Sequence, residues 1–292
     1  MANLIDKLAL GTAQFGNAHG VSNLRGRLNE AEARATLCLA GDAGLAHLDT
    51  SAEFGDAEAQ VGKLAPRERT FKITTKTVSM AGGLGALEAR ARKSLRNLGA
   101  PSAYALLINS AEDLLGPDGE LLWRKAHELK DAGLFEKIGV SMRVEDAPAA
   151  LARRFKPDIM QLPVSLLDQR LVISGELQTL ADLGVELQLR SIFLQGLLFL
   201  PRDGLPSALT SAGPRLSRIR REIAEAGADP LQAALSYALQ RPEATSVIVG
   251  VASAAELRAI IAAALAPPLQ LDWESLALDD AQARGVGMWA AA

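Results

Sequence analysis

Short β-like segments alternate with longer helical segments eight times along this chain, and this alternation limits the possible folds more than any other feature. Alternating strands and helices imply a parallel sheet whose helices cover its faces. Eight such units at fairly even spacing predict closure into an α/β (β/α)8 TIM barrel, with active groups at the carboxyl ends of the strands. The eight predicted strands span residues 7–11, 45–49, 70–75, 104–108, 137–141, 159–162, 185–191 and 246–250.

The helices are predicted from apolar spacing and from residues that suit helix ends. Five apolar side chains between Leu84 and Leu98 follow each other at gaps of three and four residues, so they share one helical face. The same spacing from Val144 to Phe155 predicts a continuous helix there. Asn29 suits the start of a helix, and Pro230 suits the first turn of another.

The chain of 292 residues is long enough for one barrel, which typically needs about 250 residues. Residues 201–229 are rich in Pro, Gly, Ser and Arg, and we interpret them as an inserted loop and helix over the end of the seventh strand. The expected organisation is therefore one domain over residues 1–292. An open dinucleotide-binding sheet is the competing fold, but residues 82–85, which read GGLG, lack the G-x-G-x-x-G spacing that would follow its first strand.

Composition excludes several classes of function. The formal net charge is −3 and basic residues are not clustered, which argues against a nucleic-acid partner. The single cysteine, Cys38, cannot form an internal disulfide or a thiolate metal cage, and its neighbours in the helix predict a buried thiol. The first residues lack a signal-peptide pattern and no run of 18 apolar residues occurs, so we expect a cytoplasmic protein that does not bind membranes.

Polar or glycine residues stand at the ends of seven predicted strands. In a barrel these positions converge on one pocket, although any one of them alone is more often a hydrogen-bonded loop anchor. The residues are Asp49, Lys76, Asn109, Ser141, Gln161, Arg190 with Ser191, and Gly250.

Several of these positions lie in segments that resemble motifs of the aldo-keto reductases. Residues 10–16 read LGTAQFG, as at the start of that family, and residues 47–55 read HLDTSAEFG, which resembles D-T-A-x-x-Y-G. Residues 74–76 read TTK, and residues 138–141 read IGVS, which resembles G-V-S-N.

The later part of the chain continues this resemblance in the same order. Residues 190–198 read RSIFLQGLL, which resembles Y-S-P-L-x-x-G-L-L, and residues 247–250 read VIVG, like the closing cofactor segment of the family. Each motif is weak alone, but the ordered set covers nearly the whole chain and makes the resemblance specific.

The resemblance implies reduction of carbonyls with a nicotinamide cofactor, using Asp, Tyr, Lys and His. Asp49 and Lys76 match the charged pair, in which Asp holds Lys and Lys lowers the tyrosine pKa from about 10. Phe54 occupies the place of the tyrosine and Asn109 the place of the histidine. The usual proton donor is therefore missing, and because general acid–base groups contribute about 10²–10⁴-fold, we expect weak activity unless another donor acts.

Three residues are candidates for the missing donor. His19 follows the first strand and has a side chain whose ordinary pKa suits the role, so it is our first choice of donor, although a histidine at such a position is more often a solvated loop residue. Glu53 is adjacent to Phe54, but we expect its side chain to point elsewhere. Lys76 could donate directly, because desolvation would lower its pKa.

The resemblance also implies the cofactor contacts. Ser141 and Gln161 would bond the nicotinamide carboxamide, and Arg190 stands where an aromatic residue usually stacks on the ring. The resemblance implies NADP as the cofactor. NAD also fits, because Val251 and Ala252 stand where a basic residue of the family often contacts the 2′-phosphate. The remaining contacts would come from Thr12 and Ser191, from Phe193, Leu194 and Gly196 at the diphosphate, and from Gly250, Ser253 and Glu256 at the adenosine half.

The first hypothesis is therefore an NAD(P)H-dependent oxidoreductase that acts on a small carbonyl or sugar-like compound, as a monomer or weak homo-oligomer without a metal. The second is an NADP(H)-binding protein with little or no turnover, a sensor or regulatory subunit, which Phe54 and Asn109 favour. A lyase that forms a Schiff base on Lys76 is the third, disfavoured because Asp49 would keep that lysine protonated.

Overall fold

Eight parallel strands close into a barrel in the computed structural model, which describes residues 4–20, 22–79, 83–201 and 204–279. Each strand pairs with the next one along the chain, and the barrel closes where Leu8 lies opposite Val247. The predicted (β/α)8 fold is confirmed. The strands are β1 (Leu8–Gly11), β2 (His47–Asp49), β3 (Lys72–Lys76), β4 (Ala103–Ile108), β5 (Phe135–Ser141), β6 (Ile159–Pro163), β7 (Glu186–Arg190) and β8 (Ala244–Gly250).

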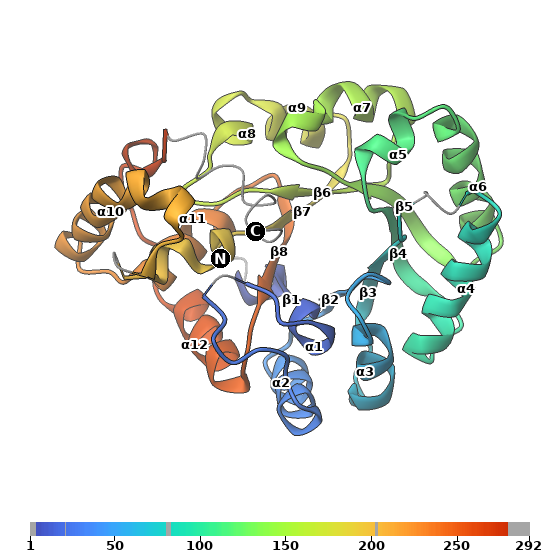
Figure 1. Cartoon of the computed structure of the whole chain (residues 1–292), viewed down its shortest axis with the longest axis horizontal. Coiled ribbons are helices and arrows are strands. Elements are labelled where there is room, and N and C mark those ends of the chain that lie inside the picture. Colours follow the sequence, from blue (N-terminus) through green and yellow to red (C-terminus); the bar gives the residue numbers. More distant parts are fainter. Residues whose placement is uncertain (1–3, 21, 80–82, 202–203, 280–292) are drawn as a thin grey trace.

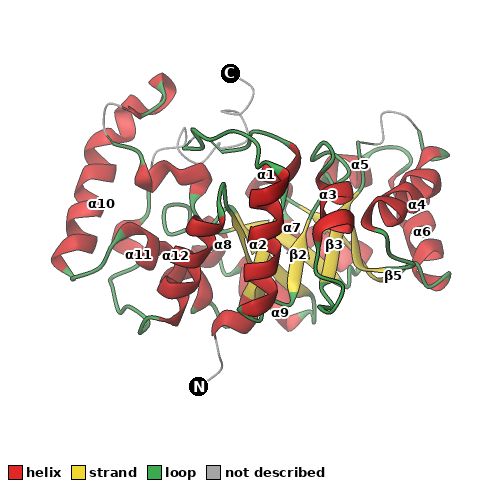
Figure 2. Ribbon diagram, turned by 90° about the horizontal axis from the view of Figure 1, so that it is seen from below, coloured by secondary structure: helices red, strands yellow, loops and turns green. Residues whose placement is uncertain are grey.

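Helices surround the ring of strands, as Figures 1 and 2 show. The longer ones are α2 (Glu30–Asp42), α3 (Ala57–Leu64), α4 (Ala86–Leu98), α6 (Gly119–Asp131), α7 (Pro148–Phe155), α9 (Glu176–Asp182), α10 (Gly213–Glu225), α11 (Pro230–Leu239) and α12 (Ala254–Leu265). Short helical turns at strand ends were not expected from the sequence: α1 (Ala13–Gly16), α5 (Ala111–Leu115), α8 (Arg170–Ile173) and the 3₁₀ turns η1 (Leu4–Lys7), η3 (Val144–Asp146), η4 (Leu194–Phe199), η6 (Ser207–Ala212) and η7 (Glu274–Leu276).

The two faces of each strand have different environments. Leu48 of β2 is 1% exposed in the apolar layer beneath the helices, whereas its neighbour Asp49 bonds side chains of other strands inside the barrel. Side chains two residues apart share a face of a strand, so the inward positions of β7 are Glu186, Gln188 and Arg190. The barrel interior is consequently polar at both ends, and its carboxyl end holds the residues singled out above.

Two expectations about the helices are wrong. The helix expected from Val144 to Phe155 is split into η3 and α7, because Ala147 adopts a left-handed φ of 50° and Pro148 occupies the first turn of α7. Cys38 is exposed rather than buried. Leu37 and Ala40, both 0% exposed, form the buried face of α2 instead.

The segment between β7 and β8 carries most of the extra structure of this barrel. It forms η4, η6, α10 and α11, and Figure 1 shows α10 at the outer edge beside α11. The helix expected near residues 216–226 begins earlier, at Gly213, because Pro214 suits its first turn. Residues 202 and 203 of the expected insertion lie outside the described part of the chain.

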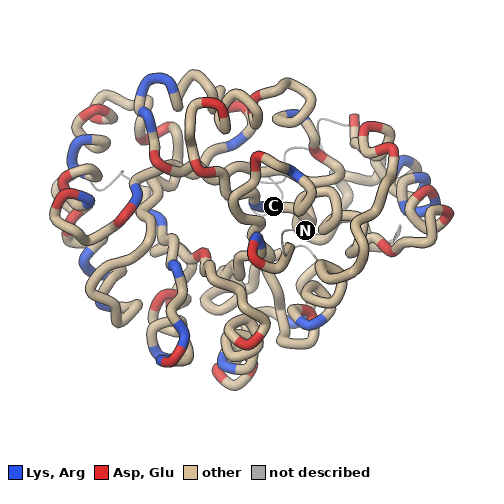
Figure 3. Tube along the Cα trace, turned by 180° about the vertical axis from the view of Figure 1, so that it is seen from behind, with Lys and Arg blue, Asp and Glu red and all other residues tan. Residues whose placement is uncertain are grey.

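Charged residues are mixed over the outside of the barrel. Figure 3 shows acidic and basic positions interleaved on the surrounding helices. Within residues 4–20, 22–79, 83–201 and 204–279, none of the helices is both long enough and apolar enough to cross a membrane.

Candidate active site

A buried ion pair joins β2 to β3 at the carboxyl end of the barrel. The Nζ atom of Lys76 donates to Asp49 Oδ1 at 2.6 Å and to the carbonyl oxygen of Thr50 at 3.0 Å. The two side chains are only 5% and 8% exposed. Burial lowers the pKa of Lys76, while the charge and hydrogen bond of Asp49 oppose that shift. The pair therefore keeps the Lys76 ammonium group out of water, and the lowered pKa makes its proton easier to transfer to a neighbouring group.

Amide side chains fix the carboxylate of this pair. Gln161 Nε2 donates to Asp49 Oδ1 at 2.7 Å and lies 3.3 Å from Gln188 Oε1. Gln188 Nε2 in turn donates to Thr74 Oγ1 at 3.3 Å. Sequence reasoning missed Gln188 and Thr74, although both stand two residues before an inward-facing residue, Arg190 or Lys76, and so share its face.

Phe54 lies against the ammonium group of Lys76. The Lys76 Nζ atom is 5.0 Å from the centroid of the Phe54 ring, a distance at which a cation is attracted to an aromatic face. Gly16 permits this arrangement, because a Cβ there would lie 1.6 Å from the carbonyl oxygen of Phe54. An apolar ring therefore borders the cation.

The end of β4 is tied to the loop that carries Phe54. Asn109 Nδ2 donates to Glu53 Oε2 at 2.7 Å, and the backbone N–H of Ser79 donates to Glu53 Oε1 at 2.9 Å. The expectation that Glu53 points elsewhere is wrong, because its carboxylate orients Asn109. One N–H of the amide is used by Glu53.

His19 lies apart from this cluster. The side chain is exposed, and partial desolvation lowers its pKa. Its backbone oxygen accepts from Asn23 Nδ2 at 3.1 Å. Among the described residues, no contact joins its imidazole to Asp49, Lys76 or Asn109, so the structure does not bring our first-choice donor to the ion pair.

Two open hydrogen-bonding positions lie side by side on β5 and β6. Ser141 pairs in register with Gln161, and the two residues are 7% and 1% exposed. The Gln161 Oε1 atom is buried and has no hydrogen-bond partner in the described part of the chain. A buried acceptor beside a hydroxyl donor suits a primary carboxamide, which has one of each. These two residues fit the nicotinamide carboxamide that the resemblance assigns to them.

The loop after β7 has a strained backbone. Three residues that are not glycine adopt left-handed φ values: Ser191 at 59°, Leu194 at 47° and Gln195 at 54°. Such conformations cost free energy and cluster at ligand-binding sites. Gly196 follows with φ 87°, and a Cβ there would lie 1.8 Å from Ser22 Oγ.

Two other segments hold this loop in place. The N–H and the hydroxyl of Ser22 both donate to the carbonyl oxygen of Gln195 at 3.3 Å. From α10, Arg220 donates to the carbonyl oxygens of Leu198 at 2.9 Å, Leu197 at 3.3 Å and Leu200. The inserted helix therefore supports the backbone that was expected to meet the diphosphate, which includes Phe193 and Leu194.

The residues expected at the adenosine half cap α12. Ser253 Oγ accepts from the N–H of Glu256 at 3.1 Å, and Glu256 Oε2 accepts from the N–H of Ala252 at 2.7 Å. Glu32 Oε1 accepts from the N–H of Ala254 at 2.7 Å. Two carboxylates therefore already occupy this helix start.

Thr12 and Gly250 lie where β1 and β8 end. Thr12 Oγ1 donates to the carbonyl oxygen of Asp49 at 3.0 Å, so it supports the ion pair from β1. A Cβ on Gly250 would lie 3.0 Å from Gln14 Nε2, which makes this a close approach between strand end and loop.

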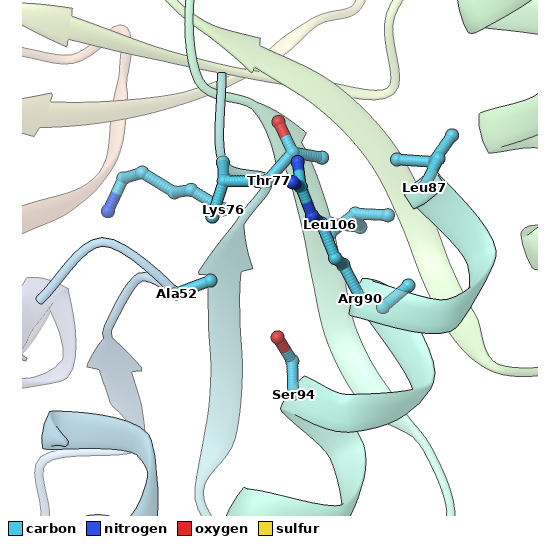
Figure 4. Close-up of a pocket in the computed structure, with 9 residues that line it drawn as sticks. Ala52, Lys76, Thr77, Leu87, Arg90, Ser94 and Leu106 are labelled. Atoms are coloured by element: carbon cyan, nitrogen blue, oxygen red, sulfur yellow. The ribbon is translucent and has the colours of Figure 1, made fainter. Parts of the chain in front are cut away.

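A small hollow beside β3 borders this cluster through Lys76. It lies between β3 and α4 and is lined by Thr77, Leu87 and Ser94 among others. Figure 4 shows the Lys76 side chain directed away from Leu87 and Ser94. The hollow therefore lies on the outer side of β3, away from the ammonium group of Lys76.

The described residues contain no group of three or more His, Cys, Asp or Glu side chains that could hold a metal ion.

Comparisons with known proteins agree with this architecture. The sequence model of the aldo/keto reductase family matches residues 7–276. An aldo-keto reductase from Mycobacterium sp. (strain MCS) is 34% identical over 122 residues, which are 39% of this chain and 41% of that relative's length.

Solved structures with the same fold cover most of the chain. An aldo-keto reductase from Bacillus halodurans in its holo form has a TM-score of 0.74 at 20% identity, covering 92% of this chain and 90% of that one. A protein of Pseudomonas aeruginosa assigned to the same family has a TM-score of 0.64 at 21% identity, with 89% of each chain covered. Because the family match extends over residues 7–276, nearly its whole length, the chain belongs to the aldo/keto reductase family.

Proposed function

We propose that this protein reduces a small carbonyl or sugar-like compound with a nicotinamide dinucleotide, and that Lys76 binds the carbonyl oxygen. The observation that supports this proposal most directly is the buried Lys76–Asp49 ion pair, which Gln161 holds in place inside the carboxyl end of the barrel. Ser141 and the unpartnered Gln161 Oε1 support the cofactor assignment, because together they match a carboxamide.

The proposed mechanism assigns the proton step to Lys76. A bound nicotinamide dinucleotide supplies the hydride. Lys76 donates a hydrogen bond to the carbonyl oxygen and passes its Nζ proton to that oxygen as negative charge develops. Burial lowers the pKa of Lys76, which makes this transfer easier than from a solvated lysine. The second N–H of Asn109, oriented by Glu53, donates to the same oxygen.

His19 is the alternative donor. Its pKa suits proton transfer near neutral pH, but its imidazole would have to reach the substrate from the loop after β1. Replacing His19 separates the two assignments, because only one of them predicts a loss of turnover.

The charges at α12 favour NAD over the NADP that the resemblance implies. Glu32 and Glu256 both accept backbone N–H groups at the start of this helix, where the 2′-phosphate was expected. A phosphate placed there would meet two carboxylates instead of free N–H donors, and like charges repel. We therefore propose NADH as the preferred cofactor.

Phe54 supports a second candidate function, that of a cofactor-binding protein with little turnover. It places an apolar ring beside Lys76 where the family has its proton donor. The two functions share the cofactor site and differ in whether carbonyl compounds are reduced.

The test combines binding and turnover. NADH and NADPH are titrated by fluorescence, and oxidation of the bound cofactor is followed with a panel of small aldehydes, ketones and sugars. The proposal expects NADH to bind more tightly than NADPH, turnover in the wild type, and a loss of about 10²-fold or more in Lys76→Met. The matched variant His19→Ala should keep its turnover.

Binding of a cofactor without turnover of any compound would favour the second function. Failure of both cofactors to bind would overturn both. A cytoplasmic location and a monomeric or weakly oligomeric state stay predictions from the sequence.

A further inference from the structure

Arg190 carries a positive charge at the barrel mouth without a carboxylate partner. Its Nη1 donates to Ser191 Oγ at 3.2 Å and its Nη2 to the carbonyl oxygen of Met142 at 2.8 Å, and both acceptors are neutral. The Nε atom is buried with no acceptor among the described residues. Within that part of the chain, Arg190 forms no ion pair, whereas surface arginines such as Arg143 do.

The guanidinium lies beside the open positions on β5 and β6. Arg190 is in register with Pro163, the last residue of β6, two residues after Gln161. By bonding the oxygen of Met142, it reaches across β6 to the residue that follows Ser141. A flat group held by Ser141 and Gln161 would therefore contact this cation.

The buried part of the barrel mouth holds two cations and one carboxylate, while the exposed carboxylate of Glu53 lies further out beside Asn109. Lys76 and Arg190 share a single carboxylate, that of Asp49, and the charge of Arg190 contributes to the lowered pKa of Lys76. Further out, the charges of Arg143 and Asp146 compensate each other, because Arg143 Nε lies 3.5 Å from Asp146 Oδ1. Arg190 is only partly exposed, so water screens its charge less than that of a surface arginine.

We propose that Arg190 makes this site discriminate between the two redox states of its cofactor, binding the reduced form more tightly than the oxidised form. This inference rests on the proposed function. The reduced nicotinamide ring is neutral and the oxidised ring is a cation, so contact with a guanidinium penalises only the oxidised state. The oxidised product would consequently leave readily, which suits an enzyme that works in the direction of reduction.

The test measures binding and needs no turnover. The dissociation constants of NADH and NAD⁺ are determined by calorimetry for the wild type, Arg190→Gln, Arg190→Lys and Arg143→Gln. The ratio of the NAD⁺ constant to the NADH constant should fall by about 10-fold or more in Arg190→Gln, mainly because NAD⁺ binds more tightly. The ratio should stay at its wild-type value in Arg190→Lys, which keeps the charge. It should also be unchanged in Arg143→Gln, which removes a nearby charge that Asp146 compensates.

Three results separate the inference from the proposed function. An unchanged ratio in folded Arg190→Gln would overturn the role of Arg190. If that variant does not fold, the wild type still decides, because NAD⁺ binding as tightly as NADH would overturn the proposal. Binding of neither nucleotide to the wild type would instead overturn the proposed function on which the inference rests.

Discussion

The two ends of the barrel each contain a lysine paired with a carboxylate, but the two pairs differ in their access to water. At the carboxyl end, Lys76 and Asp49 are 5% and 8% exposed. At the amino end, Lys137 contacts Glu186, and these side chains are 29% and 11% exposed. A charge interaction weakens as solvent enters, so the same kind of pair has different consequences at the two ends.

The amino end surrounds its pair with a buried aromatic ring, a buried histidine and a second lysine. Tyr104 donates its hydroxyl to Glu186 Oε2 at 2.7 Å, and the ammonium groups of Lys72 and Lys137 each lie 5.1 Å from the centroid of its ring. His47 packs edge-on against the same ring at 5.5 Å. In barrels of this kind, the amino end contributes to stability and the carboxyl end carries the chemistry. The comparison suggests how to separate these two roles experimentally.

Removing the lysine from each pair should give the largest contrast. Lys76→Met leaves Asp49 buried without its cation, which should lower the free energy of unfolding by about 3–5 kcal/mol and reduce turnover by about 10²-fold or more. Lys137→Met should cost about 1 kcal/mol, because water partly replaces the lost partner, and should leave turnover intact. Urea unfolding and cofactor oxidation measure the two effects. Equal destabilisation by the two variants would contradict the comparison.

Restoring a hydroxyl beside Lys76 should have the next largest effect. Phe54→Tyr places a phenol near an ammonium that lies 5.0 Å from the present ring, and this cation would favour the ionised phenol. We expect turnover of small aldehydes to rise by about 10²-fold, within the range of general acid catalysis. No gain in turnover would mean that proton donation does not limit the natural protein.

These contrasts also show how far the sequence could predict the molecule. The alternation of strands and helices was sufficient for the barrel, because parallel strands and short connections leave few alternatives. The continuous helix from Val144 failed because apolar spacing carries no information about the left-handed turn at Ala147. Cys38 was misplaced because a residue between two apolar neighbours on a helix can still face solvent.

The site could be predicted only where a strand end fixes a side chain. Asp49 and Lys76 were singled out by position, and the structure places them 2.6 Å apart. Glu53 and His19 lie in loops, whose direction the local sequence does not determine, and the structure brings Glu53 rather than His19 to the neighbouring residues. The unpaired state of Arg190 depends on every surrounding residue, so only the assembled barrel reveals it.

Removing one hydroxyl at the amino end should have a smaller effect than either change at the pairs. Tyr104→Phe deletes the donor to Glu186 Oε2, while Lys137 still satisfies that oxygen. We expect a loss of about 1 kcal/mol in the free energy of unfolding, typical of one hydrogen bond. The Michaelis constant and the turnover rate should not change, because Tyr104 lies at the end opposite Lys76. A change in either constant would mean that the two ends are coupled.

The smallest expected effect is the contribution of His47, at the amino end of the barrel, to the pH dependence of the free energy of unfolding. Burial lowers the pKa of His47, with the charges of Lys72 and Lys137 adding to the shift and Glu186 opposing it. Unfolded His47 takes up a proton near pH 6.5, whereas the folded protein takes it up only at lower pH. The unfolded state therefore binds more protons as the pH falls through about 6.5, so the folded state loses stability there until the folded pKa is reached.

His47→Gln should reduce this loss, by at most about 1.4 kcal/mol for each unit by which the folded pKa lies below the unfolded value. Urea midpoints at about pH 8 and about pH 5 measure it, and the difference between wild type and variant cancels the contribution of the carboxylates. His19 shifts in the same direction but is exposed, so His19→Gln should change the pH dependence less than His47→Gln. The reverse order would mean that the His19 imidazole is more strongly desolvated than that of His47, contrary to the exposure of the two residues.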